Sequence, residues 1–170
     1  AAVNYPHPEH RCMGDIDVLV SVERFEDAYN VLAENYKPLS EINDFHRHTS
    51  FVTESGVEIE LHKFFSESGN TKQDKLLDEM FYSAISNRVY TDIDGCRFPV
   101  LPPLENGIVL LTHIRQHLDS GLGLRQIIDW MYYVEKYLDD AMWEQFAPVA
   151  DRVGVKKLAV ISTAMCKKYL

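Results

Sequence analysis

The sequence has few cysteines and no long apolar run. Its three cysteines, Cys12, Cys96 and Cys166, are far apart and odd in number, which excludes a disulfide framework and a zinc knuckle. No apolar run reaches the roughly 18 residues that would span a bilayer. Residues 1–8 lack the basic and apolar regions of a signal peptide. We therefore expect a cytoplasmic protein with no membrane partner.

Positive charge is also scarce, with 17 Lys and Arg against 26 Asp and Glu, for a formal net charge of −9. Because phosphate backbones and anionic lipids select basic faces, this balance argues against a nucleic-acid partner. It still permits a small anionic substrate whose charge is neutralised by a metal ion. The composition, 46% hydrophobic and 25% charged, is that of a globular protein and excludes a disordered or coiled-coil chain.

The pattern of polarity changes at Leu101-Pro102-Pro103. Before this point, alternating and helical spacings predict one mixed sheet with two helices against it, followed by a small hairpin. The predicted strands are 15–22, 46–53 and 57–64, the helices 22–36 and 71–85, and the hairpin 88–101. Beyond it the sequence shows only helical patterns, at about 103–120, 124–138, 140–152 and 154–170. We therefore expect an α+β lobe over residues 1–100 and a helical lobe over 101–170.

Two aspartates, Asp15 and Asp17, follow Gly14 at the start of a very apolar strand. Residues two apart in a strand share a face, about 6–7 Å apart, so these carboxylates could hold Mg²⁺ or Mn²⁺. The alternative is a solvent-exposed strand start with no ligand role. The same tripeptide recurs at Asp92-Ile93-Asp94, but Gly95 follows it, which predicts a type I′ turn instead.

A second polar face is predicted for the strand 57–64, where Glu58, Glu60 and His62 alternate with apolar residues. A third carboxylate from this strand would complete a two-metal site with the two aspartates. The alternative is an ordinary polar outer face. His46 and His48 share a face of the preceding strand. We interpret them as ordinary polar strand residues; the alternative is that they contact a nucleotide or a metal ion.

Two histidines of the helical part, His113 and His117, are four residues apart, as are Arg125 and Asp129 on the next helix. The zinc motif H-E-x-x-H lacks its glutamate here, because Ile114 stands in that position. The pattern favours hydrogen bonds between helices and a surface ion pair over zinc binding.

Taken together, these segments resemble the uncharacterised nucleotidyltransferase family within the DNA polymerase β-like superfamily. The resemblance rests on R-x-x-G-D-I-D-x-L-V, which begins at Arg11, and on E-L-H, which begins at Glu60. The shorter matches are Tyr5-Pro6-x-Pro8, Val100-Leu101-Pro102, His113-x-x-x-His117 and Gly123-Leu124-Arg125 with Asp129. It covers nearly the whole chain. It implies a polymerase β-like mixed sheet flanked by helices and followed by a helical lobe.

The resemblance also implies an activity: Mg²⁺- or Mn²⁺-dependent transfer of a nucleoside monophosphate from an NTP to a hydroxyl acceptor. The acceptor and the oligomeric state are not readable from the sequence. Asp15 and Asp17 would ligate the metal, and Glu60 would be the third metal-binding carboxylate, helping to deprotonate the acceptor. Gly14, Arg11 and His62 are expected beside the bound nucleotide, with Arg11 at phosphate.

One departure from the superfamily pattern concerns the phosphate-binding turn. The Gly-rich phosphate turn is expected just before Tyr5-Pro6, but the sequence begins at Ala1-Ala2-Val3, so we expect the N-terminal part of the first lobe to be missing. This favours a nucleotide-binding or regulatory module of the same fold that has lost turnover. Apart from this turn, a third hypothesis after the transferase and the binding module is a metal phosphohydrolase that uses His113, His117 and Asp129.

Overall fold

The computed structural model describes residues 4–12, 14–39, 47–66, 68–93, 95–118 and 121–170. The chain forms two compact units. One comprises residues 12–86, and the other comprises residues 1–11 together with 87–170. The second unit is therefore discontinuous in sequence. The hairpin expected in the first lobe groups with the C-terminal helices, and the expected lobe boundary near residue 100 stays a prediction.

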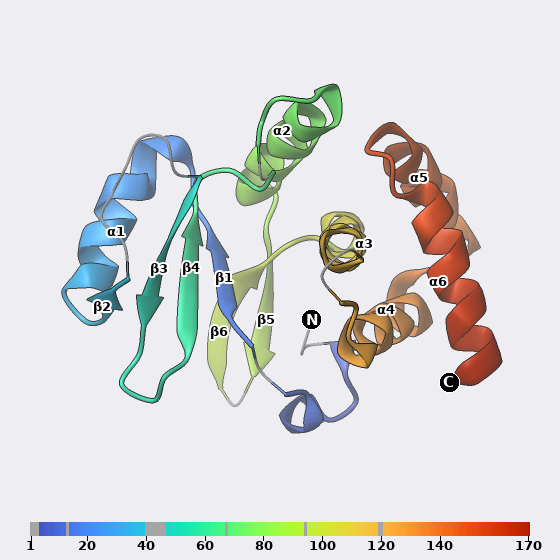
Figure 1. Cartoon of the computed structure of the whole chain (residues 1–170), viewed down its shortest axis with the longest axis horizontal. Helices are drawn as coiled ribbons and strands as arrows, with labels where there is room; N and C mark the ends of the chain where they lie inside the picture. Colours follow the sequence, from blue (N-terminus) through green and yellow to red (C-terminus); the bar gives the residue numbers. More distant parts are fainter. Residues whose placement is uncertain (1–3, 13, 40–46, 67, 94, 119–120) are drawn as a thin grey trace. The chain divides into compact units, whose positions relative to one another are not determined.

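The unit of residues 12–86 contains a four-stranded mixed sheet (Figure 1). Its strands are β1 (Ile16–Leu19), β2 (Lys37–Pro38), β3 (His48–Val52) and β4 (Glu58–His62). They lie in the order β1-β4-β3-β2. β1 runs parallel to β4, whereas β3 is antiparallel to both of its neighbours. The predicted mixed sheet is confirmed. His46, which the prediction included in the second strand, lies outside the described residues.

The core of this unit forms on one face of the sheet because apolar residues alternate along the strands. Phe51 of β3 and Ile59 and Leu61 of β4 are buried together with Phe25, the first residue of α1 (Phe25–Ala33). Each such side chain contributes about 1.5–3 kcal/mol when fully buried. The same alternation turns the polar residues of β4 toward the opposite face.

The second helix of this unit, α2 (Lys72–Ser86), is joined to the segment that follows β4. The rings of Phe65 and Phe81 lie 3.9 Å apart between centroids, and Arg47 forms an ion pair with Asp78. The Arg47 guanidinium also lies over the ring of Phe64, 4.4 Å from its centroid. These contacts hold α2 at the end of the sheet where β1 and β4 finish.

The other unit contains the hairpin of β5 (Val89–Ile93) and β6 (Cys96–Val100) and four helices. The helices are α3 (Pro103–His117), α4 (Leu124–Tyr137), α5 (Asp140–Arg152) and α6 (Lys156–Tyr169), close to the predicted ranges. Short 3₁₀ helices span Pro8–His10 in this unit and Val22–Arg24 in the other.

Side chains of α4 form the centre of the helical core. Trp130 and Tyr133 are fully buried, and Trp130 donates a hydrogen bond from Nε1 to Thr163 Oγ1 of α6 at 3.0 Å. Phe146 of α5 packs against both α4 rings. Within the described residues, no helix has the length and apolar character that crossing a membrane requires.

Candidate functional site

The candidate site lies on the polar face of the β1–β4 pair. The parallel register places Asp17 opposite Glu60 and Leu19 opposite His62. Glu60 and His62 alternate with the buried Ile59 and Leu61, so they point away from the core. Residues far apart in sequence thus meet because two strands pair in parallel with this register.

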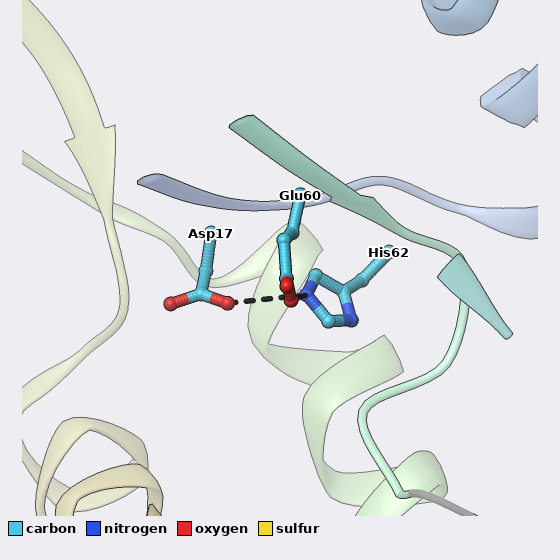
Figure 2. A group of neighbouring side chains, drawn as sticks. All are labelled: Asp17, Glu60 and His62. Atoms are coloured by element: carbon cyan, nitrogen blue, oxygen red, sulfur yellow. Dashed lines mark hydrogen bonds and ion pairs between the residues drawn. The ribbon is translucent and has the colours of Figure 1, made fainter. Parts of the chain in front are cut away.

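Three side chains from these strands converge (Figure 2). The Nε2 atom of His62 lies 3.1 Å from Asp17 Oδ1 and 3.2 Å from Glu60 Oε2. Each residue offers one ligand atom, and these atoms all lie within 4.8 Å of one another. The side chains of His62 and Glu60 are 18% and 25% exposed, and that of Asp17 is 46% exposed. We call these three residues the Asp17 group.

The Asp17 group carries an excess of negative charge. Two carboxylates at the 4.8 Å limit repel by about 1–3.5 kcal/mol, depending on how far water screens them. The one imidazole nitrogen faces both carboxylates, but it carries at most one hydrogen. A divalent cation would neutralise both carboxylates at once. Two carboxylate oxygens and an imidazole nitrogen are suitable donors for such an ion.

Asp15, the first aspartate of the Asp15-Ile16-Asp17 motif, lies outside the Asp17 group. Asp15 and Gly14 are exposed and precede β1, whose first paired residue is Ile16 opposite Ile59. Asp15 therefore has no β4 partner in the register, and it is not among the residues of the Asp17 group. The structure brings together Asp17, Glu60 and His62. The catalytic roles of Asp15, Asp17 and Glu60 stay predictions.

A polar pairing in the other unit was not predicted from the sequence. Arg11 donates from Nε and Nη2 to the two carboxylate oxygens of Asp129, at 2.8 and 2.9 Å. Tyr5 donates from its hydroxyl to Asp129 Oδ1 at 2.7 Å. The Asp129 side chain is 5% exposed. Burial raises the pKa of Tyr5, and the hydrogen bond to Asp129 raises it further.

This pairing bears on two expected roles. The Arg11 guanidinium is engaged with Asp129 in the structure, and its expected contact with phosphate stays a prediction. Asp129, which one alternative made a metal ligand with His113 and His117, accepts hydrogen bonds from Arg11 and Tyr5. Tyr5 and Asp129 belong to the shorter matches of the family resemblance, and Arg11 begins its longest motif; these motifs were the available signal.

Asp92 and Ile93 of the second aspartate tripeptide lie at the end of β5, before the turn that contains Gly95. Gly95 has a φ of 78°, a left-handed conformation that suits glycine, and its N–H donates to Asp92 Oδ1 at 3.1 Å. Asp94 lies outside the described residues. Asp92 thus serves the β5–β6 connection, as the sequence predicts.

A cavity of about 300 Å³ lies in the same unit as the candidate site. Its walls are mainly apolar and include four aromatic side chains, Phe64, Phe65, Phe81 and Tyr82, and also the charged residues Lys63, Asp78 and Glu79. Leu19 of β1 also lines it, and Leu19 is the residue opposite His62 in the strand register. A mainly apolar recess is therefore present on the strand β1 that carries Asp17.

Comparison with known proteins matches the chain to a family. No curated protein matches it. A family model described as "Uncharacterised nucleotidyltransferase" matches residues 1–170. Because this match covers the whole sequence, the chain belongs to the family of uncharacterised nucleotidyltransferases.

Proposed function

We propose that the protein transfers a nucleoside monophosphate from an NTP to a hydroxyl acceptor, with a divalent metal ion bound at the Asp17 group. The observation that carries this proposal is the parallel pairing of β1 and β4, which sets the Asp17 and Glu60 carboxylates beside each other on one sheet face. Membership of the nucleotidyltransferase family supports the reaction class.

The reaction needs a base, an electrophile and charge neutralisation. The acceptor oxygen attacks the α-phosphorus, the bond from that phosphorus to the bridging oxygen breaks, and pyrophosphate leaves. Glu60 would take the acceptor proton and pass it to solvent. Bound Mg²⁺ or Mn²⁺ supplies neutralisation of the triphosphate charge. Asp17 and Glu60 would hold the ion, and Asp15 would join them when a nucleotide is bound.

The apolar part of a substrate would bind in the cavity lined by Phe64, Phe65, Phe81 and Tyr82. Leu19, which lies opposite His62 in the strand register, is one of its walls. A planar ring of the acceptor or the nucleobase would fit its apolar walls, which include Leu19, Phe64, Phe65, Phe81, Tyr82 and Ile85.

The test is pyrophosphate release from each NTP, measured with Mg²⁺ or Mn²⁺ in the presence of a mixture of small hydroxylated metabolites. Glu60→Gln should lower the rate by about 100-fold or more, since a positioned general base alone contributes that much. Asp17→Asn should also lower it strongly, because it removes a ligand of the metal ion that neutralises the triphosphate. Both variants should stay folded, because each removes a charge from a crowded acidic site.

The matched control is Glu58→Gln, which alters the same face of β4 but lies outside the Asp17 group. It should keep most of the activity. Full activity in Asp17→Asn would refute the proposed mechanism, and loss in Glu58→Gln with full activity in Glu60→Gln would reassign the third carboxylate.

A second candidate is a nucleotide-binding module without turnover. The position of Asp15, outside the Asp17 group, favours it. This candidate predicts that Mg-ATP binds, as measured by calorimetry, while no pyrophosphate appears with any acceptor.

A further inference from the structure

We infer that His62 is a metal ligand alongside Asp17 and Glu60, and that this nitrogen makes the centre select a first-row transition ion, such as Mn²⁺ or Zn²⁺, over Mg²⁺. The inference rests on the proposed function for the presence of a metal ion. It goes further by assigning a nitrogen ligand and a preference among ions.

The distances within the Asp17 group match the spacing of ligands around a single ion. Ligands at about 2.0–2.2 Å from an ion and at right angles to each other are separated by roughly 3 Å. The Nε2 atom of His62 lies 3.1 Å from Asp17 Oδ1 and 3.2 Å from Glu60 Oε2. Both carboxylates thus already lie at ligand spacing from the His62 nitrogen, and the three donor atoms all lie within 4.8 Å of one another.

The His62 ring is held in place by the sheet. β4 is a central strand, paired to β1 on one side and to β3 on the other, so its backbone is fixed from both sides. His48 lies opposite His62 on β3, and the two rings are 5.0 Å apart between centroids. His62 is also the least exposed side chain of the group. A ligand that is already positioned loses little freedom when the ion binds.

The donor chemistry decides which ion is favoured. Mg²⁺ takes oxygen ligands in near-ideal octahedral geometry, whereas imidazole nitrogen suits the transition ions. A site with three carboxylates would accept Mg²⁺ readily. The set of Asp17, Glu60 and His62 replaces one oxygen with nitrogen, and affinity among first-row divalent ions at such a site rises from Mn²⁺ toward Cu²⁺.

The chain offers a matched control in His48. It has the same side chain, lies on the same sheet face and contacts His62, yet it is not among the residues of the Asp17 group. A variant of His48 therefore changes the neighbouring ring without removing the proposed ligand.

The experiment is titration of the protein with Mn²⁺ followed by electron spin-echo spectroscopy, which detects a nitrogen bound directly to the ion. Wild type and His48→Gln should show nitrogen coupling, and His62→Gln should not. The affinity for Mn²⁺ should fall at least tenfold in His62→Gln, and the preference for Mn²⁺ over Mg²⁺ should shrink with it. Circular dichroism checks that each variant is folded.

A second variant keeps the test decisive if His62→Gln does not fold. His62→Asp supplies an oxygen ligand, so it should bind metal without nitrogen coupling and shift its preference toward Mg²⁺. Bound Mn²⁺ without nitrogen coupling in wild type would overturn the inference, and so would coupling that persists in His62→Asp. Nitrogen coupling with no nucleotidyl transfer would overturn the proposed function alone, and transfer without coupling would overturn the inference alone.

Discussion

At the scale of single residues, the structure separates buried charges that hold the fold from exposed charges available for chemistry. Asp129 is buried with its hydrogen bonds taken by Arg11 and Tyr5, whereas Asp17 is nearly half exposed. A buried ion pair that loses one partner leaves an uncompensated charge, which is costly. Asp129 therefore stabilises the fold. Its sequence motif alone does not distinguish this structural role from the role of a ligand.

The first prediction concerns that buried pair. Asp129→Ala should lower the free energy of unfolding by about 3 kcal/mol, because Arg11 would be left buried without its counter-charge. Urea unfolding measures the change. The control is Asp27→Ala, which breaks the exposed pair of Asp27 with Arg24 and should cost less than about 1 kcal/mol. Equal losses in the two variants would contradict this account.

The second prediction is a dependence on pH. The pKa of Tyr5 in the folded protein is raised above its ordinary 10.0, first by burial and then by Asp129. A group with a raised folded pKa contributes stability that is complete below its unfolded pKa and is lost as pH rises above it. The stability advantage of wild type over Tyr5→Phe should therefore shrink by about 1 kcal/mol from about pH 9 to about pH 11. Urea unfolding across this range measures it. A constant difference would show that the phenol titrates alike in both states.

At the scale of elements, the sequence predicted the strands and helices whose apolar residues are periodic. It did not predict the short strand β2 or the register between strands. The strands β1, β3 and β4 and the helices follow from alternation and helical spacing. β2 is two residues long, Lys37–Pro38, and has no period to detect. Alternation also placed Glu60 and His62 on one face. Glu60 was predicted as the partner of Asp17 only through the family resemblance, because the parallel register of β1 with β4 is a tertiary contact that periodicity does not give.

The third prediction concerns the packing of α3 on α4. A Cβ atom added to Gly107 would lie 2.4 Å from Cζ and from the hydroxyl oxygen of Tyr133. Gly107→Ala should therefore lower the free energy of unfolding by about 1–3 kcal/mol, although alanine is the better helix former. Tyr133→Phe should be neutral or stabilising, since that buried hydroxyl has no hydrogen-bond partner among the described residues. The double variant should recover part of the loss. Higher stability in Gly107→Ala alone would contradict the close approach.

At the scale of the whole molecule, one sequence motif serves two units. The string that begins at Arg11 contributes Arg11 to the unit of residues 1–11 and 87–170, and Asp17 to the unit of residues 12–86. The boundary between the units falls inside the motif. Adjacency in sequence therefore does not by itself place Arg11 at the Asp17 group.

The fourth prediction follows from this division. An ion that binds only the folded site stabilises it by about 2.7 kcal/mol when its concentration is a hundred times its dissociation constant. Amides of β1 and β4 that exchange through unfolding of residues 12–86 should then exchange about 100-fold more slowly with Mn²⁺. Amides of α4 and α6 should be unchanged if the two units open separately. Hydrogen exchange with mass spectrometry measures both sets at once, and Asp17→Asn is the control that should abolish the effect. Equal slowing in all four elements would show that the units unfold as one, and slowing confined to α4 and α6 would place the bound ion outside the Asp17 group.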